Sequence, residues 1–259
     1  MDAQTGKPSR RRSSLNFPEA PPRLTITWMK VSAIIVAAGS SRRMGFDKLS
    51  ADLCGESVLT RSILAFQACP DVEEIRVVVS PEKFEEVKSA VSRLGISKFV
   101  EVLAGGTERH LSVCAGLEKI VGESDLVAVH DGARPLVSAN AISRCATVAA
   151  VSGAAALARR VVDTLKRSNA EGKVTGAVSR DDLWAMETPQ IFSVLLLREA
   201  YAAVLQRGEV VTDEVSAVTG IGHTVRLVEN TEPNLKITVP GDLLIAEAFL
   251  RRKVTENRP

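Results

Sequence analysis

Short apolar runs alternate with longer amphipathic segments along most of this chain. The runs are rich in β-branched and small residues, as in "VSAIIVAA" (31–38) and "DLVAVH" (125–130), and each has the length of a single strand. The segments between them have helical periodicity and helix-boundary residues, such as Pro81 in a first turn and Gly95 after a last turn. This alternation predicts an α/β fold: a Rossmann-like, mostly parallel sheet with helices on both faces.

The expected elements follow this pattern from residue 31 to near the end of the chain. We expect strands over 31–38, 74–80, 98–103, 125–130, 153–158, 223–229 and 235–239, and helices over 57–69, 81–94, 109–120, 138–151, 211–220 and 240–253. Thr212 is the expected N-cap of the helix over 211–220. Residues 159–182 interrupt the pattern with two short β-prone runs around "SNAEGK", which predicts a projecting β-hairpin arm. Residues 29–259 are therefore predicted to form one domain that carries this arm.

The first 28 residues predict a disordered basic tail, because four prolines and "RRRSS" leave little periodicity. The same stretch could be a nucleic-acid-binding arm or part of a plastid transit peptide, and Met29 could be the true start of translation. Six of the 33 basic residues, but only two of the 31 acidic ones, lie in the first 30 positions. The rest of the chain is slightly acidic, which argues against nucleic-acid binding by the folded part.

Hydropathy and cysteine spacing indicate the compartment. No apolar run reaches the roughly 18 residues of a membrane-spanning helix, and the chain does not begin with an apolar signal segment. The four cysteines are far apart and form no C-x-x-C pair, which argues against a zinc site or a disulfide framework. We therefore expect a cytoplasmic protein with reduced cysteines and no membrane contact.

The first apolar run continues into the cationic loop "AAGSSRRMGFDK" (37–48). A glycine-containing loop after the first strand of such a sheet can point backbone N–H groups at phosphates. The loop matches neither the G-x-G-x-x-G fingerprint nor the P-loop pattern. We expect Arg43 and Lys48 to bind phosphate, and Arg42 to be a solvated loop residue.

A second candidate site, "VHDGARPLV" (129–137), follows the apolar run over 125–130. Ligands of open α/β sheets bind beyond the carboxyl ends of the strands, where this stretch is expected to lie. Asp131 can orient a hydroxyl or a metal-bound water, and Arg134 can bind an anionic group beside it. Gly132 is expected to let a ligand approach the backbone, and His130 to be a packed histidine at the strand end.

Seven motifs in register carry a resemblance to a known family. They are "AAGSSRRMGFDK" (37–48), "GGTERHLSVCAGL" (105–117), "VHDGARP" (129–135), "DTLKR" (163–167), "SRDDLWAMETPQIF" (179–192), "TDEVSAV" (212–218) and "NLKITVPGDLLIAE" (234–247). In this order they resemble the motif series of the 2-C-methyl-D-erythritol 4-phosphate cytidylyltransferases. The resemblance covers about residues 31–253.

The resemblance implies a reaction and a set of residues for it. A phosphate oxygen of methylerythritol phosphate would attack the α-phosphorus of CTP in line and release pyrophosphate, in isoprenoid precursor biosynthesis, with Mg²⁺ bridging the phosphates. The implied catalytic residues are Arg43, Lys48, Asp131 and Lys236. The implied CTP-binding residues are Ala37, Ala38, Gly39, Gly106, Thr107 and Ser112, with Thr107 at a position where many relatives carry Asp. No direct metal ligand is implied, although Asp131 could reach a metal through water.

The resemblance also implies a homodimer in which the arm of one subunit completes the active site of the other. Thr164 and Arg180 of the arm would enter the partner's site beside Thr212 and Lys236. The implied binding set for the alcohol phosphate is Asp131, Arg134, Thr164, Arg180, Thr212 and Lys236. Asp213 and Glu214 are expected only to cap their helix.

Two alternatives remain open from the sequence. Ribitol 5-phosphate cytidylyltransferases resemble the same motifs and differ mainly in the alcohol pocket. A nucleotide-binding protein without catalysis is the other alternative, although Arg43, Lys48, Asp131, Arg180 and Lys236 are all present.

Overall fold

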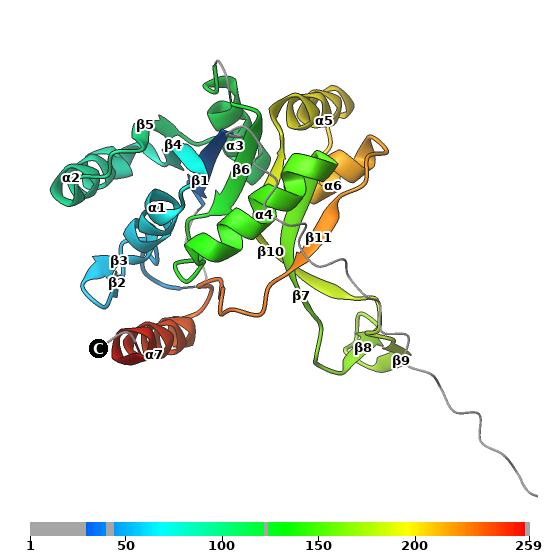
Figure 1. The fold of residues 1–259 in the computed structure, drawn as a ribbon. Helices are drawn as coiled ribbons and strands as arrows, with labels where there is room; N and C mark the ends of the chain where they lie inside the picture. The colour runs from blue at the N-terminus through cyan, green and yellow to red at the C-terminus, as the bar shows by residue number, and fades with distance from the viewer. Residues whose placement is uncertain (1–29, 40–43, 122–123, 257–259) are drawn as a thin grey trace, which may run out of the picture.

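A seven-stranded sheet runs through the protein, whose computed structural model describes residues 30–39, 44–121 and 124–256 (Figure 1). The predicted basic tail, residues 1–28, and Arg43 lie outside the described residues. In spatial order the strands are β11 (Arg226–Glu229), β7 (Ala154–Arg160), β10 (Trp184–Ser193), β6 (Leu126–Asp131), β1 (Val31–Ala37), β4 (Val72–Val79) and β5 (Phe99–Ala104). β10 is antiparallel to its two neighbours and every other pairing is parallel, which confirms the predicted mostly parallel sheet.

Helices cover both faces of this sheet, as predicted. Side chains of α1 (Val58–Ala68), α2 (Phe84–Leu94) and α4 (Ala139–Ser152) belong to one core cluster, and those of α3 (Arg109–Glu118), α5 (Val194–Arg207) and α6 (Glu214–Gly220) to a second. The remaining elements are β2 (Asp52–Leu53), β3 (Glu56–Ser57), the 3₁₀ turn η1 (Pro81–Lys83), β8 (Leu165–Ser168), β9 (Val174–Val178) and α7 (Pro240–Glu256). No helix among the described residues is long and apolar enough to cross a membrane.

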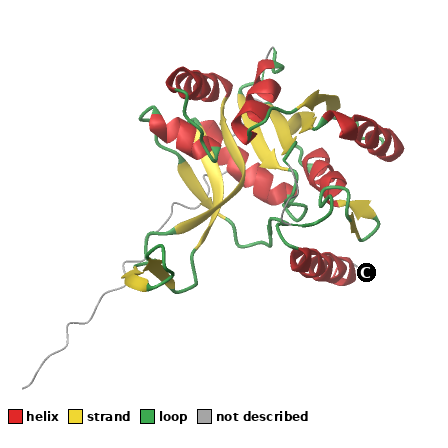
Figure 2. Ribbon diagram, turned by 180° about the vertical axis from the view of Figure 1, so that it is seen from behind, coloured by secondary structure: helices red, strands yellow, loops and turns green. Residues whose placement is uncertain are grey.

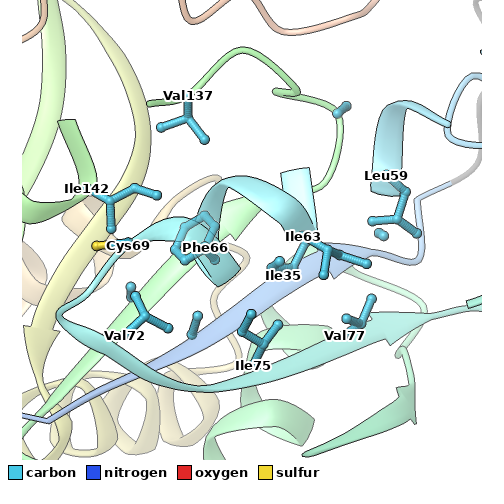
Figure 3. Packing of buried hydrophobic residues seen from close by; sticks show 14 of the residues in the cluster. Ile35, Leu59, Ile63, Phe66, Cys69, Val72, Ile75, Val77, Val137 and Ile142 are labelled. Atoms are coloured by element: carbon cyan, nitrogen blue, oxygen red, sulfur yellow. The ribbon is translucent and has the colours of Figure 1, made fainter. Parts of the chain in front are cut away.

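The two cores arise from the two-residue period of the strands. In β1, Ala33 and Ile35 belong to the first cluster and Ile34 to the second. Figure 3 shows the first cluster, where α1 packs Ile63 and Phe66 across the strands. Phe66 is fully buried, and burial of such a side chain stabilises the fold by about 2 to 3 kcal/mol. Both faces of the sheet are thus occupied, which leaves its carboxyl edge for a site.

The predicted β-hairpin arm is confirmed. β7 and β10 pair as far as Arg160 and Trp184, and β8 and β9 then pair only with each other. The hairpin turns at Gly172, which has a φ of +78°, and Asn169 Oδ1 accepts bonds from two backbone N–H groups of the turn. Figures 1 and 2 both show this hairpin extending away from the sheet and its helices.

Two expectations about elements are wrong, and two elements of the structure were not expected. Residues 235–239 form no strand; Ile237 N donates to Ala133 O, but Ala133 lies beyond the end of β6, so no strand edge continues there. Asp213, not Thr212, caps α6, because its carboxylate reaches Ser216 N at 3.0 Å. β10 and α5 were not expected, because Pro189 and three polar neighbours obscure the strand pattern of β10.

Candidate active site

Asp131 lies at the carboxyl end of β6, surrounded by three cations. Lys236 Nζ is 2.7 Å from Asp131 Oδ2, the Arg109 guanidinium is 3.2 Å from Oδ1, and Arg134 Nε is 3.6 Å from Oδ2. Asp131 is only 8% exposed. Burial alone would raise the pKa of Asp131, but the charges of Arg109, Lys236 and Arg134 outweigh burial and hold it well below the ordinary 3.8. The carboxylate is therefore charged at neutral pH.

Arg109 also forms a bidentate ion pair with Glu214, which joins the first residues of α3 and α6. The two N–O distances are 2.6 and 3.1 Å, and Tyr201 donates its hydroxyl to Glu214 Oε1 at 2.8 Å. Glu214 is fully buried. Burial lowers the pKa of Arg109, but Glu214 and Asp131 outweigh it and raise this pKa above its usual value. Burial, followed by Glu214, raises the pKa of Tyr201. Arg109 thus connects Asp131 to a buried carboxylate.

His130 supports the site without facing it. Its ring is fully buried, 4.9 Å from the ring of Phe66 by centroids, and burial lowers the pKa of His130 to about 3. Its Nδ1 lies 3.0 Å from Thr188 Oγ1 and its Nε2 lies 3.2 Å from Arg134 O. The neutral histidine connects β10 to the turn after β6, which agrees with the predicted packed histidine.

Strand β10 forms one wall of the site through Thr188 and Gln190. Thr188 Oγ1 accepts a bond from Asp131 N at 3.1 Å. Gln190 Oε1 accepts bonds from Glu214 N and Val215 N, and Gln190 Nε2 donates to the Asp213 carboxylate at 3.1 Å. The amide of Gln190 thereby fixes the start of α6 against the sheet.

A cavity of about 400 Å³ lies between these elements. Charged groups of both signs line it: the cations Arg109, Arg134 and Lys236 surround Asp131, and Glu187 lines the same cavity. Thr188, Gln190, Thr212, Asp213, Ser216 and Met186 complete the lining. A cavity of this size with convergent charged groups suits a small polar ligand that carries an anionic group.

The expected CTP-binding segments meet beside this cavity, at the carboxyl ends of β1 and β5. A Cβ atom at Gly105 would lie 2.1 Å from Ala38 Cβ and 2.9 Å from Ser112 Oγ. Gly106 N donates to Ser112 Oγ at 3.1 Å. This close approach requires glycine at position 105. Gly39, Gly106 and Thr107, which lie around it, are exposed.

Lys48 connects the loop after β1 with the segment that carries Lys236. Lys48 Nζ donates to Ile237 O at 2.9 Å, and Ile237 N donates to Ala133 O at 2.8 Å. Lys48 is not part of the cavity lining. Lys48, at the end of the loop after β1, is thus linked through Ile237 to Ala133, which follows β6.

The sequence matches the profile of the family IspD: 2-C-methyl-D-erythritol 4-phosphate cytidylyltransferase over residues 31–252. The chain belongs to this family. Among similar curated cytidylyltransferases, the one from Caldanaerobacter subterraneus subsp. tengcongensis is 39% identical over 227 residues, which cover 86% of this chain and 100% of the relative. The one from Desulforamulus reducens is 38% identical over 226 residues, covering 86% and 97% of the two chains. The resemblance seen in the motifs is confirmed.

Solved structures of cytidylyltransferases have the same fold. The 4-diphosphocytidyl-2C-methyl-D-erythritol synthase of Anaerococcus prevotii superposes with a TM-score of 0.77 at 27% identity, covering 87% of this chain and all of that one. The cytidylyltransferase of Thermus thermophilus superposes with a TM-score of 0.70 at 34% identity, covering 86% of this chain and all of that one. The predicted fold class is thus confirmed.

Within this cytidylyltransferase, most of the expected site residues converge. Asp131, Arg134, Thr212 and Lys236 line one cavity, and Ala37, Ala38, Gly39, Gly106, Thr107 and Ser112 lie around the neighbouring glycine segment. Thr164 and Arg180 do not join them in the single chain. Both are exposed on the arm, where Arg180 donates to Val162 O.

Two residues differ from their expected roles. Gly132 does not open space for a ligand: a Cβ atom there would lie 2.9 Å from Leu59 Cδ1 and 3.1 Å from Ala37 Cβ, so glycine is needed for internal packing. Glu214 does more than cap a helix, because it is the buried partner of Arg109. A carboxylate in a first turn looks like a cap in sequence, and only the fold shows its burial.

Three residues of the cytidylyltransferase site have no role predicted from the sequence. They are Arg109, expected only to begin a helix, and Thr188 and Gln190. Arg109 did carry a signal, because a cation in the first helical turn opposes the helix dipole unless carboxylates pair with it. Thr188 and Gln190 flank Pro189, which obscured the strand pattern of β10, so neither of them carried a recognisable signal.

Proposed function

We propose that the protein transfers the cytidylyl group of CTP to 2-C-methyl-D-erythritol 4-phosphate. The products are 4-diphosphocytidyl-2-C-methyl-D-erythritol and pyrophosphate. The observation that carries this proposal is the cation-lined cavity at Asp131, directly beside the glycine segment at Gly105 and Gly106, in a chain of this family. Two anionic substrates need two adjoining sites with cations between them.

The nucleotide site would hold CTP with its triphosphate near the loop after β1. Gly39 is exposed and can present its backbone N–H group to phosphate oxygens, and the exposed Gly106 lets the nucleotide approach the backbone. Ala37, Ala38, Thr107 and Ser112 would surround the base. Arg43 and Lys48 would neutralise charge on the α-phosphate and the leaving pyrophosphate as it develops.

The cavity at Asp131 would hold the alcohol phosphate. Lys236 and Arg134 can bind the phosphate, while the charged Asp131 accepts a hydrogen bond from a hydroxyl of the alcohol. Thr212 lines the same cavity and can bond another hydroxyl. An oxygen of the bound phosphate then attacks the α-phosphorus in line, and the P–O bond to pyrophosphate breaks. Positioning and charge neutralisation suffice, so no covalent enzyme intermediate is required.

We propose that the Mg²⁺ of this reaction is carried by CTP and not by the protein. Both carboxylate oxygens of Asp131 already face cations, and the described residues contain no cluster of three or more His, Cys, Asp or Glu side chains that could hold a metal ion. The donor set therefore does not fit a directly ligated metal. Mg²⁺ coordinates phosphate oxygens and water readily.

We also propose a cytoplasmic location. All four cysteines are free, and Cys69 and Cys145 are buried as small apolar side chains. Proteins that keep several unpaired cysteines suit a reducing compartment.

We further propose a homodimer whose arms complete the sites. Thr164 and Arg180 are exposed on the arm and outside the Asp131 cavity of their own chain, as are the apolar side chains of Val162 and Val174. An isolated two-stranded hairpin is marginally stable in water, so an arm of this kind gains from packing against a partner. A role for Arg180 in the partner's active site would explain why Arg180 lies outside the Asp131 cavity of its own chain.

Mixed dimers test the shared site. Arg180→Ala and Lys236→Ala should each abolish most turnover as pure dimers. In refolded one-to-one mixtures, half of the dimers pair the two variants and carry one intact site, so we expect about a quarter of wild-type activity. Mixtures that stay inactive, or a monomer in sedimentation at micromolar concentration, would contradict the arrangement.

The function is tested by pyrophosphate release from CTP and Mg²⁺, with methylerythritol phosphate and ribitol 5-phosphate in parallel. We expect turnover with methylerythritol phosphate and a roughly 100-fold loss of kcat in Lys48→Ala. The stability of that variant should stay near wild type, because a partly exposed loop lysine contributes little to folding. Faster turnover with ribitol 5-phosphate would identify that compound as the substrate. No pyrophosphate release with either compound would favour a nucleotide-binding protein without catalysis.

A further inference from the structure

A second lysine, Lys83, holds the turn on which Lys48 lies. Lys83 is the last residue of η1, directly after β4, and its ammonium contacts Asp47 Oδ2 and Ser50 Oγ. The same ammonium is 3.0 Å from Glu86 Oε2. Asp47 and Ser50 flank Lys48 in the turn, so Lys83 reaches the turn from a different part of the sheet edge.

Asp47 closes this turn from inside. Its Oδ1 accepts a bond from Leu49 N at 3.1 Å and its Oδ2 accepts the Ser50 hydroxyl at 2.6 Å. Partial burial raises the pKa of Asp47, but the bonds from Lys83 and Ser50 outweigh it and lower this pKa. Burial lowers the pKa of Lys83, but the bonds to Asp47 and Glu86 outweigh it and raise that pKa. Both groups of the Lys83–Asp47 pair are thus charged at neutral pH.

The turn is held differently on its two sides. On the apolar side, Leu49 is buried in the core and its carbonyl accepts a bond from Leu59 N at 3.1 Å. On the polar side, the contacts of Lys83 with Asp47 and Ser50 bring the turn against η1 and the start of α2. Loss of Lys83 would therefore remove its own contacts with Asp47 and Ser50, and would leave the hydrogen bond from Ser50 to Glu86 and the apolar side of the turn in place.

We propose that Lys83 is a positioning residue for the nucleotidyl transfer. It acts through Asp47 and Ser50 to fix the Lys48 ammonium, which bonds to Ile237 O beside Lys236. Lys83 does not line the Asp131 cavity, so it does not itself meet the alcohol phosphate there. The inference depends on the proposed function, in which Lys48 neutralises the phosphates.

The first test is Lys83→Met in the full-length protein, with kcat and KM for both substrates measured by pyrophosphate release. We expect kcat to fall roughly 10- to 100-fold, because small misplacement of a charged group costs about this much, with little change in KM for methylerythritol phosphate. Lys83→Arg keeps a cation for the same carboxylates and should restore most of the rate. Lys88→Met is the matched control: its exposed ammonium pairs with Glu85 at 3.1 Å on the same helix, and its kcat should equal wild type.

A double substitution separates positioning through Lys48 from a general structural role. In a Lys48→Ala background, Lys83→Met should cause no further loss of kcat, since the group it positions is gone. A second loss of the same size, or wild-type kcat in Lys83→Met alone, would overturn the inference. Should Lys83→Met fail to fold, Asp47→Asn weakens the same contact from the other side and faces the same two criteria. Absence of turnover in the wild type would instead refute the proposed function.

Discussion

Asp131→Asn should lower kcat by roughly 1000-fold, because the amide removes the carboxylate charge that Lys236, Arg109 and Arg134 share at the cavity. It should also lower the free energy of unfolding by about 3 kcal/mol. Asn has the same shape, so packing is preserved and the change is electrostatic. Urea unfolding and pyrophosphate release measure the two effects separately.

The pH dependence of this destabilisation has a definite sign. The folded-state pKa of Asp131 lies well below the ordinary 3.8, so its stabilising contribution is complete above that value and is lost as the pH falls below it. The difference in unfolding free energy between wild type and Asp131→Asn should therefore be constant near neutrality and shrink toward about pH 3. A difference that is independent of pH would mean that the carboxylate charge does not stabilise the fold.

Asp125→Asn is the matched control for this experiment. Asp125 directly precedes β6, at the end opposite Asp131, and its side chain is not part of the cavity lining. The same chemical change there should alter turnover little and unfolding by no more than about 0.5 kcal/mol. If Asp131→Asn kept wild-type turnover, Asp131 would have only a structural role in the ion cluster.

Much of the fold follows from local periodicity, which is why its strands and helices could be predicted. The position of Asp131 could also be predicted, because the carboxyl ends of parallel strands form one edge of the sheet, where ligands bind. Lys236 converges there although it lies on no strand, and only its motif indicated this. The topology of the sheet thus predicts the position of a residue at a strand end, such as Asp131, but not that of a residue outside the strands, such as Lys236.

The Arg109–Glu214 pair could not be read from the sequence. The two residues are 105 positions apart. Glu214 looks like an ordinary first-turn carboxylate, and the first-turn cation Arg109 indicates a carboxylate partner but not which one. Their pairing depends on how α3 and α6 approach each other over the end of the sheet. The site to which Thr164 and Arg180 contribute could likewise not be predicted from local sequence pattern, because their expected place depends on a second subunit.

Glu214→Gln should destabilise the protein by about 3 to 5 kcal/mol, because it leaves the Arg109 guanidinium beside a neutral and fully buried amide. Turnover should fall as well, since Arg109 loses the partner that holds it against Asp131. Urea unfolding measures the first effect. Glu199→Gln on α5, the same change at an exposed carboxylate, should stay within about 0.5 kcal/mol of wild type.

The double variant Arg109→Met/Glu214→Leu then separates stability from function. Replacing both members of a buried ion pair by apolar side chains is often close to neutral, so the double variant should be more stable than Glu214→Gln alone. Its turnover should stay low, because Asp131 still lacks the Arg109 contact. If the double variant recovers both stability and turnover, the ion pair only fills space. If it recovers stability alone, the buried pair is needed for the reaction at Asp131 and not for the stability of the fold.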